Sequence, residues 1–359
     1  MKVMTILGTR PEIIRLSLII SKLDKLCEHL LVHTGQNYST SLNNIFFQLL
    51  EIRKPDYYLN IKEKTFGKQL GRILCEIEEI LNIERPDKVL ILGDTNSGLA
   101  AIAAVKSGIP VFHLEAGNRC FDSKVPEENN RKVIDSIATY NLPYTPGSRE
   151  NLLLTGIEKK KIFLSGNPIY EVLTYYKNQI KNSSILQDLK LEKNNYILVT
   201  IHRSENVDIK DRLEIIIKAI NKIQNQLDFR MIFSVHPRTK DKLKKFKLLI
   251  QNSDIFYSKP FGFFDFVKLE KNAALVLTDS GTVQEECCIF KVPTVTVRDT
   301  TERPETVECG SNIVSGINYE RIIKCAELMY NSNRNWSYPE GYIDKNVSDK
   351  VIAFLLSKK

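Results

Sequence analysis

Short apolar runs alternate along the chain with longer segments in which apolar residues recur every three or four positions. The short runs are rich in β-branched residues and predict buried strands, whereas the longer segments predict amphipathic helices. The first half contains six strand candidates, at residues 3–7, 30–34, 89–93, 111–115, 141–145 and 161–166. Nearly continuous apolar strands separated by helices are typical of a parallel sheet with helices on both faces.

The same alternation begins again in the second half of the chain. Its strand candidates are residues 196–202, 229–236, 274–280 and 294–299. The polar stretch 176–195 between the halves is a candidate linker region.

We therefore predict an α/β fold with two Rossmann-like domains, parallel sheets and an interdomain cleft. The first domain is expected over residues 1–168 and the second over residues 169–340. An amphipathic helix within 341–359, with Ser348 as a possible N-cap, is expected to close the chain by packing back toward the first domain.

Length and composition agree with this picture. A chain of 359 residues is long enough for two domains, and 43% hydrophobic with 26% charged residues argues against collagen-like or disordered classes. The net charge of +8 comes from residues spread along the chain, so we expect no nucleic-acid partner. No stretch approaches 18 consecutive apolar residues, so no membrane span is expected.

The cysteines and histidines do not predict a metal site. The seven cysteines include no C-x-x-C pair, and five histidines show no zinc-like spacing. Unpaired thiols favour a reducing cytoplasm. Arg10 and Glu12 interrupt the first apolar run too early for a signal peptide, which also favours a cytoplasmic location.

Several polar motifs directly follow predicted strands, where open α/β sheets bind ligands. The motif G-T-R-P-E over residues 8–12 places Arg10 in a glycine-led turn at a helix start. Such a turn binds anions, and an arginine adds bidentate contact to phosphate. A tight turn with a surface arginine is the alternative. The absence of G-x-G-x-x-G disfavours a nicotinamide cofactor.

Carboxylates lie in three loops of the first half. Asp94 follows one predicted strand, Glu115 ends the next, and Glu127 and Glu128 follow in V-P-E-E-N-N-R. Each alone could be a cap or turn residue. Together they are costly unless cations or chemistry balance them, and such clusters supply a proton acceptor and a proton donor.

The second half carries a candidate diphosphate site in T-D-S-G-T-V-Q-E-E. Ser280 and Gly281 open a predicted helix, and Glu286 lies about two turns further on, where it could reach ribose hydroxyls. An ordinary cap with a solvated acid is the alternative. Arg298 and Arg303 flank a later turn that could complete an anion cradle.

Two further features remain open between structure and function. His202 ends a predicted strand and is followed by an arginine, whereas the structural interpretation is favoured for His236. The phenylalanine-rich segment 260–266 is either core or a stacking wall for a uracil ring.

Taken in order, the motifs resemble those of one family. G-T-R-P-E, G-D-T-N-S, E-A-G with a downstream P-E-E-x-x-R, H-R-x-E-N, D-S-G-x-x-Q-E-E and R-D-T-T-E-R-P-E are similar to the non-hydrolysing UDP-N-acetylglucosamine 2-epimerases, between residues 8 and 305. The resemblance implies a glycosyltransferase-B-like pair of Rossmann domains, a UDP-sugar substrate, no cofactor and a homodimer.

The resemblance also implies roles for individual residues. The catalytic set would be Asp94, Glu115, Glu127 and His202, with His202 also near the diphosphate. The substrate-binding set would be Arg10, Arg15, Phe266 against the uracil, Ser280, Gly281, Thr282, Glu286 and Arg303. The family often has lysine at the position of Arg15 and glycine at that of Ile201. Arginine keeps the charge of lysine but not its geometry.

Four segments resemble one branch of the family. R-P-E-I-I-R-L-S, H-T-G-Q-N-Y, E-A-G-N-R-C-F-D and P-F-G-F-F-D are similar to enzymes that make UDP-N-acetyl-L-fucosamine from UDP-2-acetamido-2,6-dideoxy-L-talose for capsule or O-antigen (lipopolysaccharide) biosynthesis. Simpler members commonly have leucine where Asn118 stands. The alternatives are a UDP-N-acetylglucosamine 2-epimerase giving UDP-N-acetylmannosamine, a hydrolysing 2-epimerase, a UDP-sugar glycosyltransferase and a non-catalytic nucleotide- or RNA-binding module.

The family mechanism eliminates UDP across C1–C2 to leave a 2-acetamidoglycal and then adds UDP back with protonation from the other face. We expect Asp94 and Glu127 to divide the two proton transfers, with Glu115 holding the sugar or tuning their pKa values.

Overall fold

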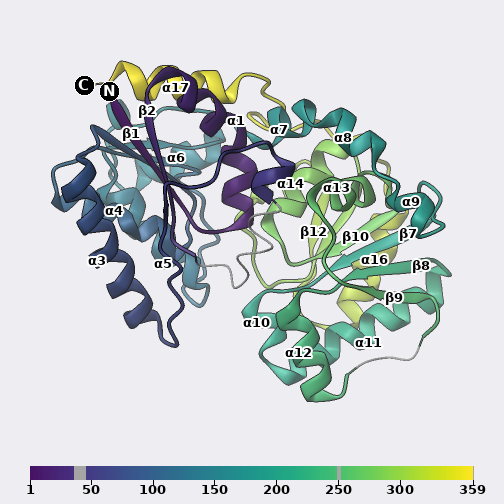
Figure 1. Cartoon of the computed structure of the whole chain (residues 1–359). Helices are drawn as coiled ribbons and strands as arrows, with labels where there is room; N and C mark the ends of the chain where they lie inside the picture. Colours follow the sequence, from purple (N-terminus) through teal and green to yellow (C-terminus); the bar gives the residue numbers. More distant parts are fainter. Residues whose placement is uncertain (36–45, 249–251, 359) are drawn as a thin grey trace. The chain divides into compact units, whose positions relative to one another are not determined.

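The computed structural model describes residues 1–35, 46–248 and 252–358. The chain divides into two compact units, drawn together in Figure 1. The first comprises Met1–Thr174 and Glu340–Lys359, and the second comprises Tyr175–Pro339. Both are α/β layers built on a parallel sheet.

The first unit contains a six-stranded parallel sheet in the order β3-β2-β1-β4-β5-β6. Its strands are β1 Lys2–Leu7, β2 Glu28–His33, β3 Tyr57–Tyr58, β4 Lys88–Leu92, β5 Val111–Leu114 and β6 Tyr140–Leu142. The strand order reverses direction between β1 and β4, which pair with each other. In open α/β sheets, ligands bind beyond the carboxyl ends of the strands at such a reversal.

Helices cover both faces of this sheet because alternate strand residues are apolar on each face. Met4, Ile6, Val89 and Ile91 pack in one core with helices α3 Phe66–Glu84, α4 Ala101–Lys106 and α5 Pro126–Ile137. Further helical segments of the first unit include α1 Arg10–Leu26, α6 Pro146–Leu154, α7 Ile169–Tyr175 at the unit boundary and α17 Val347–Ser357. Two 3₁₀ turns, η1 Asn96–Ala100 and η2 Lys159–Lys161, also belong to it.

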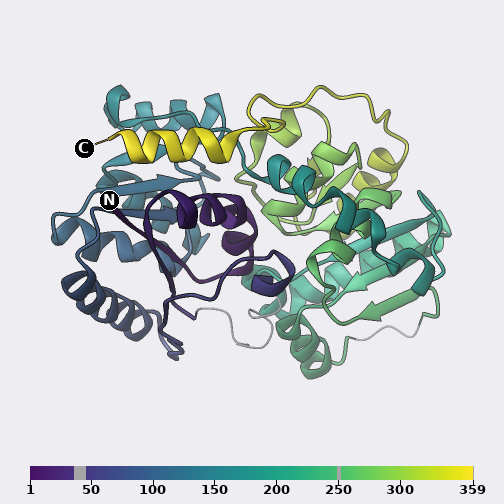
Figure 2. The ribbon, with the colours of Figure 1, turned by 45° about the horizontal axis from the view of Figure 1, so that its top comes forward.

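The last helix of the chain belongs to the first unit. Figure 2 shows α17, in yellow, beside α1. Lys22 of α1 donates to the Ser348 hydroxyl at 2.8 Å, and the buried Lys88 of β4 donates to the Leu355 carbonyl at 2.7 Å. Phe354 stacks on Phe163 with ring centroids 4.2 Å apart.

The second unit repeats the same topology. Its sheet has the order β12-β11-β10-β7-β8-β9, so the direction reverses between β7 and β10. The strands are β7 Tyr196–Thr200, β8 Arg230–Ser234, β9 Ile255–Ser258, β10 Leu275–Thr278, β11 Thr294–Thr296 and β12 Asn312–Val314.

Two apolar clusters flank this second sheet. One joins it to α11 Lys210–Leu227, α12 Pro237–Phe246 and α16 Tyr319–Tyr330, and the other joins it to α9 Ile185–Asp188, α13 Phe263–Asn272 and α14 Gly281–Phe290. The shorter helices are α8 Lys177–Asn182, α10 Ser204–Val207 and α15 Pro304–Glu308.

The prediction of two parallel-sheet Rossmann-like domains is confirmed, and three details differ. The strand expected at 161–166 is wrong, because that segment makes only an isolated bridge from Ile162 to Asn141. The short edge strands β3, β9 and β12 were not predicted. The polar stretch 176–195 forms α8 and α9, whose Ile180 and Ile185 are buried, so it is part of the second unit.

Among the helices of the described residues, none has both the length and the apolar character needed to cross a membrane.

Candidate functional site

The first switch point is held together by a buried carboxylate, Glu12. The turn from β1 to α1 ends at Thr9, and the Glu12 carboxylate accepts hydrogen bonds from the backbone amides of Gly8 at 2.6 Å and Thr9 at 2.7 Å. Its other oxygen accepts from the Thr95 hydroxyl, also at 2.6 Å, in the loop after β4. Glu12 therefore joins the two loops that diverge at the switch point. Burial raises its pKa to about 7, although these hydrogen bonds oppose the shift.

Arg10 is the first residue of α1, and helix N-termini favour anions. Its guanidinium lies 5.6 Å from the centre of the Phe46 ring, and partial burial lowers its pKa. An arginine remains charged under such a shift. The described geometry is therefore compatible with the expected phosphate contact.

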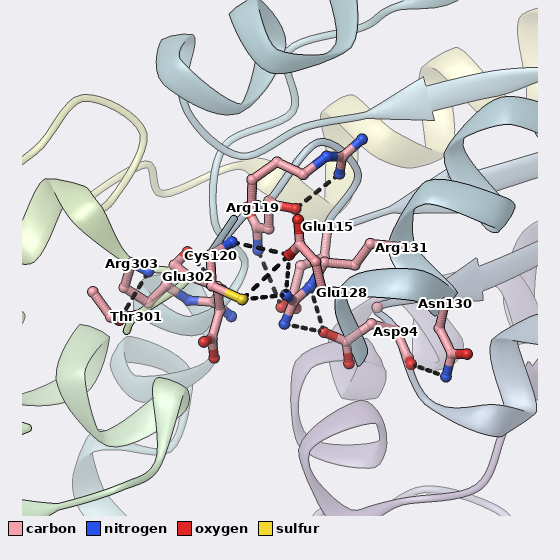
Figure 3. A network of polar contacts seen from close by, with 12 residues as sticks. Asp94, Glu115, Arg119, Cys120, Glu128, Asn130, Arg131, Thr301, Glu302 and Arg303 are labelled. Carbon is pink, nitrogen blue, oxygen red and sulfur yellow. Dashed lines mark hydrogen bonds and ion pairs between the residues drawn. The ribbon is translucent and has the colours of Figure 1, made fainter. Parts of the chain in front are cut away.

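Asp94 follows β4 and is oriented by Arg131 from α5, as Figure 3 shows. The Asp94 carboxylate accepts a hydrogen bond from Arg131 Nε at 2.7 Å and lies 2.6 Å from Arg131 Nη2. The Asp94 backbone carbonyl accepts from the Asn130 side-chain amide at 2.9 Å. Both nitrogens of Arg131 contact the same carboxylate oxygen, Oδ2, and such charge-assisted contacts hold that oxygen in place. Helix α5 thus determines where Asp94 points.

The two adjacent glutamates of α5 have different environments. Glu128 is fully buried and accepts from the Cys120 backbone amide at 2.9 Å and from Arg131 at 3.0 Å. Burial alone would raise its pKa, but these contacts outweigh it and lower the pKa of Glu128. Glu127, in the first turn of the same helix, is partly exposed. Glu127 is thus the more accessible of the two to a substrate.

Glu115 ends β5 and adopts a left-handed backbone conformation with φ 70°. Its carboxylate pairs with the buried Arg15 at 2.7 Å and accepts from the Asn118 amide at 3.3 Å. Asn118 in turn accepts from the Ser148 hydroxyl at 2.8 Å. Arg15 was expected to be a nucleotide ligand, but in this structure its guanidinium forms an ion pair with Glu115. Its contact with a nucleotide stays a prediction.

A buried ion cluster supports the loops that carry Asp94 and Glu115. Asp135 of α5 contacts His113 Nδ1 at 2.9 Å and Arg119 at 2.6 Å, and it accepts from the Gly117 amide at about 3.2 Å. The other ring nitrogen of His113 lies 2.9 Å from the Gly93 carbonyl. His113 and Arg119 together outweigh burial and lower the pKa of Asp135. The cluster ties the turn at Gly93 to the turn at Gly117.

The second switch point is built on Asp279, which follows β10. Its buried carboxylate accepts from the backbone amides of His202 at 3.0 Å and Arg203 at 2.9 Å, after β7. It also accepts from the Asn206 amide at 3.1 Å and lies 3.2 Å from the His202 ring. Asp279 therefore orients His202 by both its backbone and its ring.

The start of α14 is closely surrounded by charged side chains. Gly281 has no room for a side chain, because a Cβ there would lie 2.4 Å from Glu302. Glu302 pairs with Arg298 at 2.8 Å and Arg203 at 3.3 Å. The Arg303 Nε pairs with Glu285 of α14 at 2.5 Å. Figure 3 also shows Arg303 beside Thr301, whose hydroxyl accepts from the Arg303 amide at 3.1 Å.

The remaining expected nucleotide ligands lie on α13 and α14. Ser280 occupies the N-cap position of α14 without a side-chain capping hydrogen bond, and Thr282 is in the first turn. Glu286 is buried next to Glu270 of α13, and burial together with the nearby Glu286 carboxylate raises the pKa of Glu270 well above its usual range. Phe266 packs partly buried against the α13–α14 core, so core packing and base stacking remain compatible.

Within the first unit, the structure brings Asp94 and Glu115 to the ends of adjacent strands, with Glu127 in the helix that orients Asp94. Within the second unit, it gathers His202, Ser280, Gly281 and Arg303 at one switch point. Sequence reasoning missed the supporting roles of Glu12, Arg131 and Asp279. All three stand inside the quoted motifs, so the motifs themselves were the signal.

Among the described residues, no group of three or more histidine, cysteine, aspartate or glutamate side chains is arranged to hold a metal ion.

Comparison with known proteins places the chain among similar sequences and structures. A family model described as UDP-N-acetylglucosamine 2-epimerase matches residues 21–356. A Methanocaldococcus jannaschii protein named UDP-N-acetylglucosamine 2-epimerase is 48% identical over 349 residues, covering 95% of both chains. A Pseudomonas aeruginosa protein named UDP-2,3-diacetamido-2,3-dideoxy-D-glucuronate 2-epimerase is 37% identical and covers 91% of each chain.

A solved structure has the same fold. The crystal structure of Methanocaldococcus jannaschii UDP-GlcNAc 2-epimerase in complex with UDP-GlcNAc and UDP superposes with a TM-score of 0.95, at 45% identity and full coverage of both chains.

Proposed function

The chain belongs to the UDP-N-acetylglucosamine 2-epimerase family and is a UDP-sugar 2-epimerase, and we propose that it inverts C2 of a UDP-2-acetamido sugar by eliminating and re-adding UDP. The proposal is supported within each unit separately. The first unit has oriented carboxylates at its switch point, and the second has an arginine-rich helix start at its own. Family membership also decides against the glycosyltransferase and the non-catalytic alternatives.

The substrate requires this route because no carbonyl group adjoins C2. Direct removal of the C2 proton would leave a carbanion without stabilisation. Departure of UDP from C1 removes that difficulty, since the electron pair of the C2–H bond forms the C1–C2 double bond of a glycal. One base and one acid on opposite sugar faces then suffice, and each contributes roughly 10² to 10⁴ in rate.

Asp94 and Glu127 are proposed to exchange the proton at C2. Arg131 fixes Asp94, and α5 carries both Arg131 and Glu127, so one helix sets the positions of both carboxylates. Glu115 is proposed to hold the sugar or tune its neighbours, because Arg15 and Asn118 engage both of its oxygens. These contacts leave Glu115 less suited to proton exchange than Glu127.

The departing UDP carries the charge that develops in the transition state. Arg10, Arg303, His202 and the α14 start at Ser280 are proposed to receive its diphosphate, and Glu286 to bind the ribose. Preorganised cations and backbone amides stabilise such charge without rearrangement. The buried Asp279 supports this role by fixing the backbone on either side of His202.

For the sugar, we propose UDP-2-acetamido-2,6-dideoxy-L-talose, which would give UDP-N-acetyl-L-fucosamine for capsule or O-antigen. Asn118 supports this assignment, because its buried amide contacts Glu115 and accepts from Ser148, which a leucine at this position could not do. UDP-N-acetylglucosamine is the second candidate. It is supported by the similar proteins that carry this substrate in their names.

Product analysis tests both substrates. The protein is incubated separately with each UDP-sugar, without any acceptor, and products are identified by NMR. We expect a C2 epimer from the L-talo sugar at a kcat/KM at least tenfold above that from UDP-N-acetylglucosamine. The reverse ratio would contradict the assignment of the sugar, and release of a free sugar as the main product would contradict the non-hydrolysing reaction.

A cytoplasmic homodimer is proposed as the working form, from the family resemblance and the free thiols. Sedimentation of the purified protein at micromolar concentration tests the dimer, and a monomer there would contradict it.

A further inference from the structure

Two cysteines of the second unit lie in contact. Cys288 is in α14, and Cys309 follows α15 as its C-cap residue. Their Sγ atoms are 3.7 Å apart, which is van der Waals contact. A disulfide needs about 2.05 Å between the sulfurs, so closure requires a relative movement of about 1.7 Å.

The two thiols differ in access. Cys288 is fully buried, and its backbone carbonyl accepts from the indole of Trp336 at 3.1 Å. Cys309 is partly exposed, and its sulfur lies 3.3 Å from the Ser311 hydroxyl. A reagent in solution therefore reaches Cys309 before Cys288.

The local electrostatics favour the same order. The hydrogen bond with the Cys288 thiol lowers the pKa of Cys309, and Ser311 and Lys291 add to this shift while burial opposes it. The same hydrogen bond, followed by burial, raises the pKa of Cys288. The thiolate is the reactive form of cysteine, so Cys309 is the nucleophile of the pair.

We propose that Cys288 and Cys309 form a redox-active dithiol that closes to a disulfide in reaction with a low-molecular-weight disulfide. The Cys309 thiolate attacks one sulfur of the reagent, forms a mixed disulfide and releases the first thiolate. Cys288 then loses its proton and attacks Cys309 Sγ, which forms the Cys288–Cys309 bond and releases the second thiolate. The protein loses two electrons and two protons, and the reagent is reduced to two thiols.

Neighbouring cysteines supply the controls. Cys287 adjoins Cys288 in sequence, but it packs in the α13–α14 core cluster, where burial raises its pKa. Cys75 is exposed on α3 of the first unit. Cys75 can form a mixed disulfide with the same reagent, so reaction there measures accessibility alone.

The bond would join two elements near the proposed diphosphate ligands. Helix α14 begins at Gly281, and α15 begins directly after Arg303. The thiol chemistry is independent of the proposed function, because it is detected from the protein mass and peptides rather than from turnover.

The test treats the intact protein with oxidised glutathione and follows it by mass spectrometry and tryptic mapping. We expect the loss of two hydrogens and a linked pair of peptides, 272–291 and 299–321, both reversed by a dithiol reductant. Fluorescence of Trp336, the one tryptophan of the sequence, should change with the same time course because its indole binds the Cys288 carbonyl.

Variants assign the bond. Cys288→Ser should lose the linked peptides and retain glutathione on Cys309, whereas Cys287→Ser and Cys75→Ser should leave the link intact. Cys288→Ala provides the same comparison if serine disturbs the buried position. Persistence of the link without Cys288, or glutathione on Cys75 with both Cys288 and Cys309 still reduced, would overturn the proposal.

Discussion

At the scale of single residues, each acidic side chain of the first switch point has a different partner, and the partner limits what it can do. Two nitrogens of Arg131 contact one oxygen of Asp94, and both oxygens of Glu115 have partners. Glu128 is buried and accepts from a backbone amide and an arginine. Glu12 accepts hydrogen bonds from uncharged donors in two loops. The different surroundings therefore suit similar carboxylates to the different roles proposed for them, as acid–base group, sugar contact or support.

Replacement of Asp94 by asparagine separates proton transfer from binding. The amide keeps the shape and one acceptor for Arg131, but it cannot exchange a proton at C2. We expect kcat to fall by roughly 10² to 10⁴, with the UDP Kd changed less than about threefold. Steady-state kinetics and calorimetric UDP titration provide the two values. A kcat near that of the unmodified protein would remove Asp94 from the mechanism.

The raised pKa of Glu12 predicts a pH-dependent stability. Because the folded protein holds this proton more tightly than the unfolded chain, stability falls as pH rises from the ordinary value of 4.5 through about 7. The charged form of Glu12 is thus the costly one. Glu12→Gln removes this dependence, so the variant should gain stability relative to the unmodified protein between pH 5 and pH 8, by up to about 3 kcal/mol. Urea unfolding of both proteins at pH 5 and pH 8 measures the difference in their free energies of unfolding. A difference that is the same at both pH values would contradict the raised pKa of Glu12.

At the scale of elements, each part of the proposed site consists of a strand, the loop that follows it and the start of the next helix. Both sheets place one strand pair at a direction reversal, and in each a buried acid joins the two loops, Glu12 in the first unit and Asp279 in the second. Ligand contacts in this fold come from loops. The buried acids therefore determine how accurately those loops are positioned.

The α14 start offers a test at this scale. Gly281→Ala places a Cβ against Glu302, which Arg298 and Arg203 hold in place, so we expect UDP affinity to fall at least tenfold and stability to fall by about 1–3 kcal/mol. Gly71→Ala is the matched control. It has open space within helix α3 and should gain about 0.5–1 kcal/mol with unchanged UDP affinity. Equal UDP affinity in both variants would show that Gly281 is not at the nucleotide.

The sequence alone predicted the elements whose apolar pattern or turn motif lies within a few neighbouring residues. Apolar runs located the central strands, and turn motifs located Asp94, Glu115 and Ser280. The edge strands β3 and β12 were not predicted, because strands of two or three residues are too short to show a periodic pattern of apolar positions. The run 161–166 has strand composition, but it makes a single bridge to Asn141. The Asp135–His113–Arg119 cluster could not be predicted, since its contacts exist only after folding.

At the scale of the whole molecule, the chain begins and ends in the same unit. Helix α17 returns to the first unit, where the buried Lys88 donates to the Leu355 carbonyl and also contacts the Lys358 carbonyl. Buried lysine is tolerated only when its protons are satisfied. These bonds attach the last helix to β4, which leads directly to Asp94.

Lys88→Met therefore tests whether the last helix supports β4 and the loop that carries Asp94. Methionine keeps the apolar stem but leaves the carbonyls of the last turn without their donor, which costs about 1–3 kcal/mol. We expect faster amide hydrogen exchange in α17 and β4, and unchanged exchange in the second-unit helix α11. Increased exchange in α11 to the same degree would contradict a local effect.

The central claim is that C2 loses its hydrogen when UDP departs, and one measurement tests it directly. The protein is incubated with its UDP-2-acetamido sugar in D₂O, and C2 of the product epimer is examined by NMR and mass spectrometry. The account predicts one deuterium at C2 in essentially every product molecule. An epimer formed at the normal rate with its original C2 hydrogen retained would contradict it.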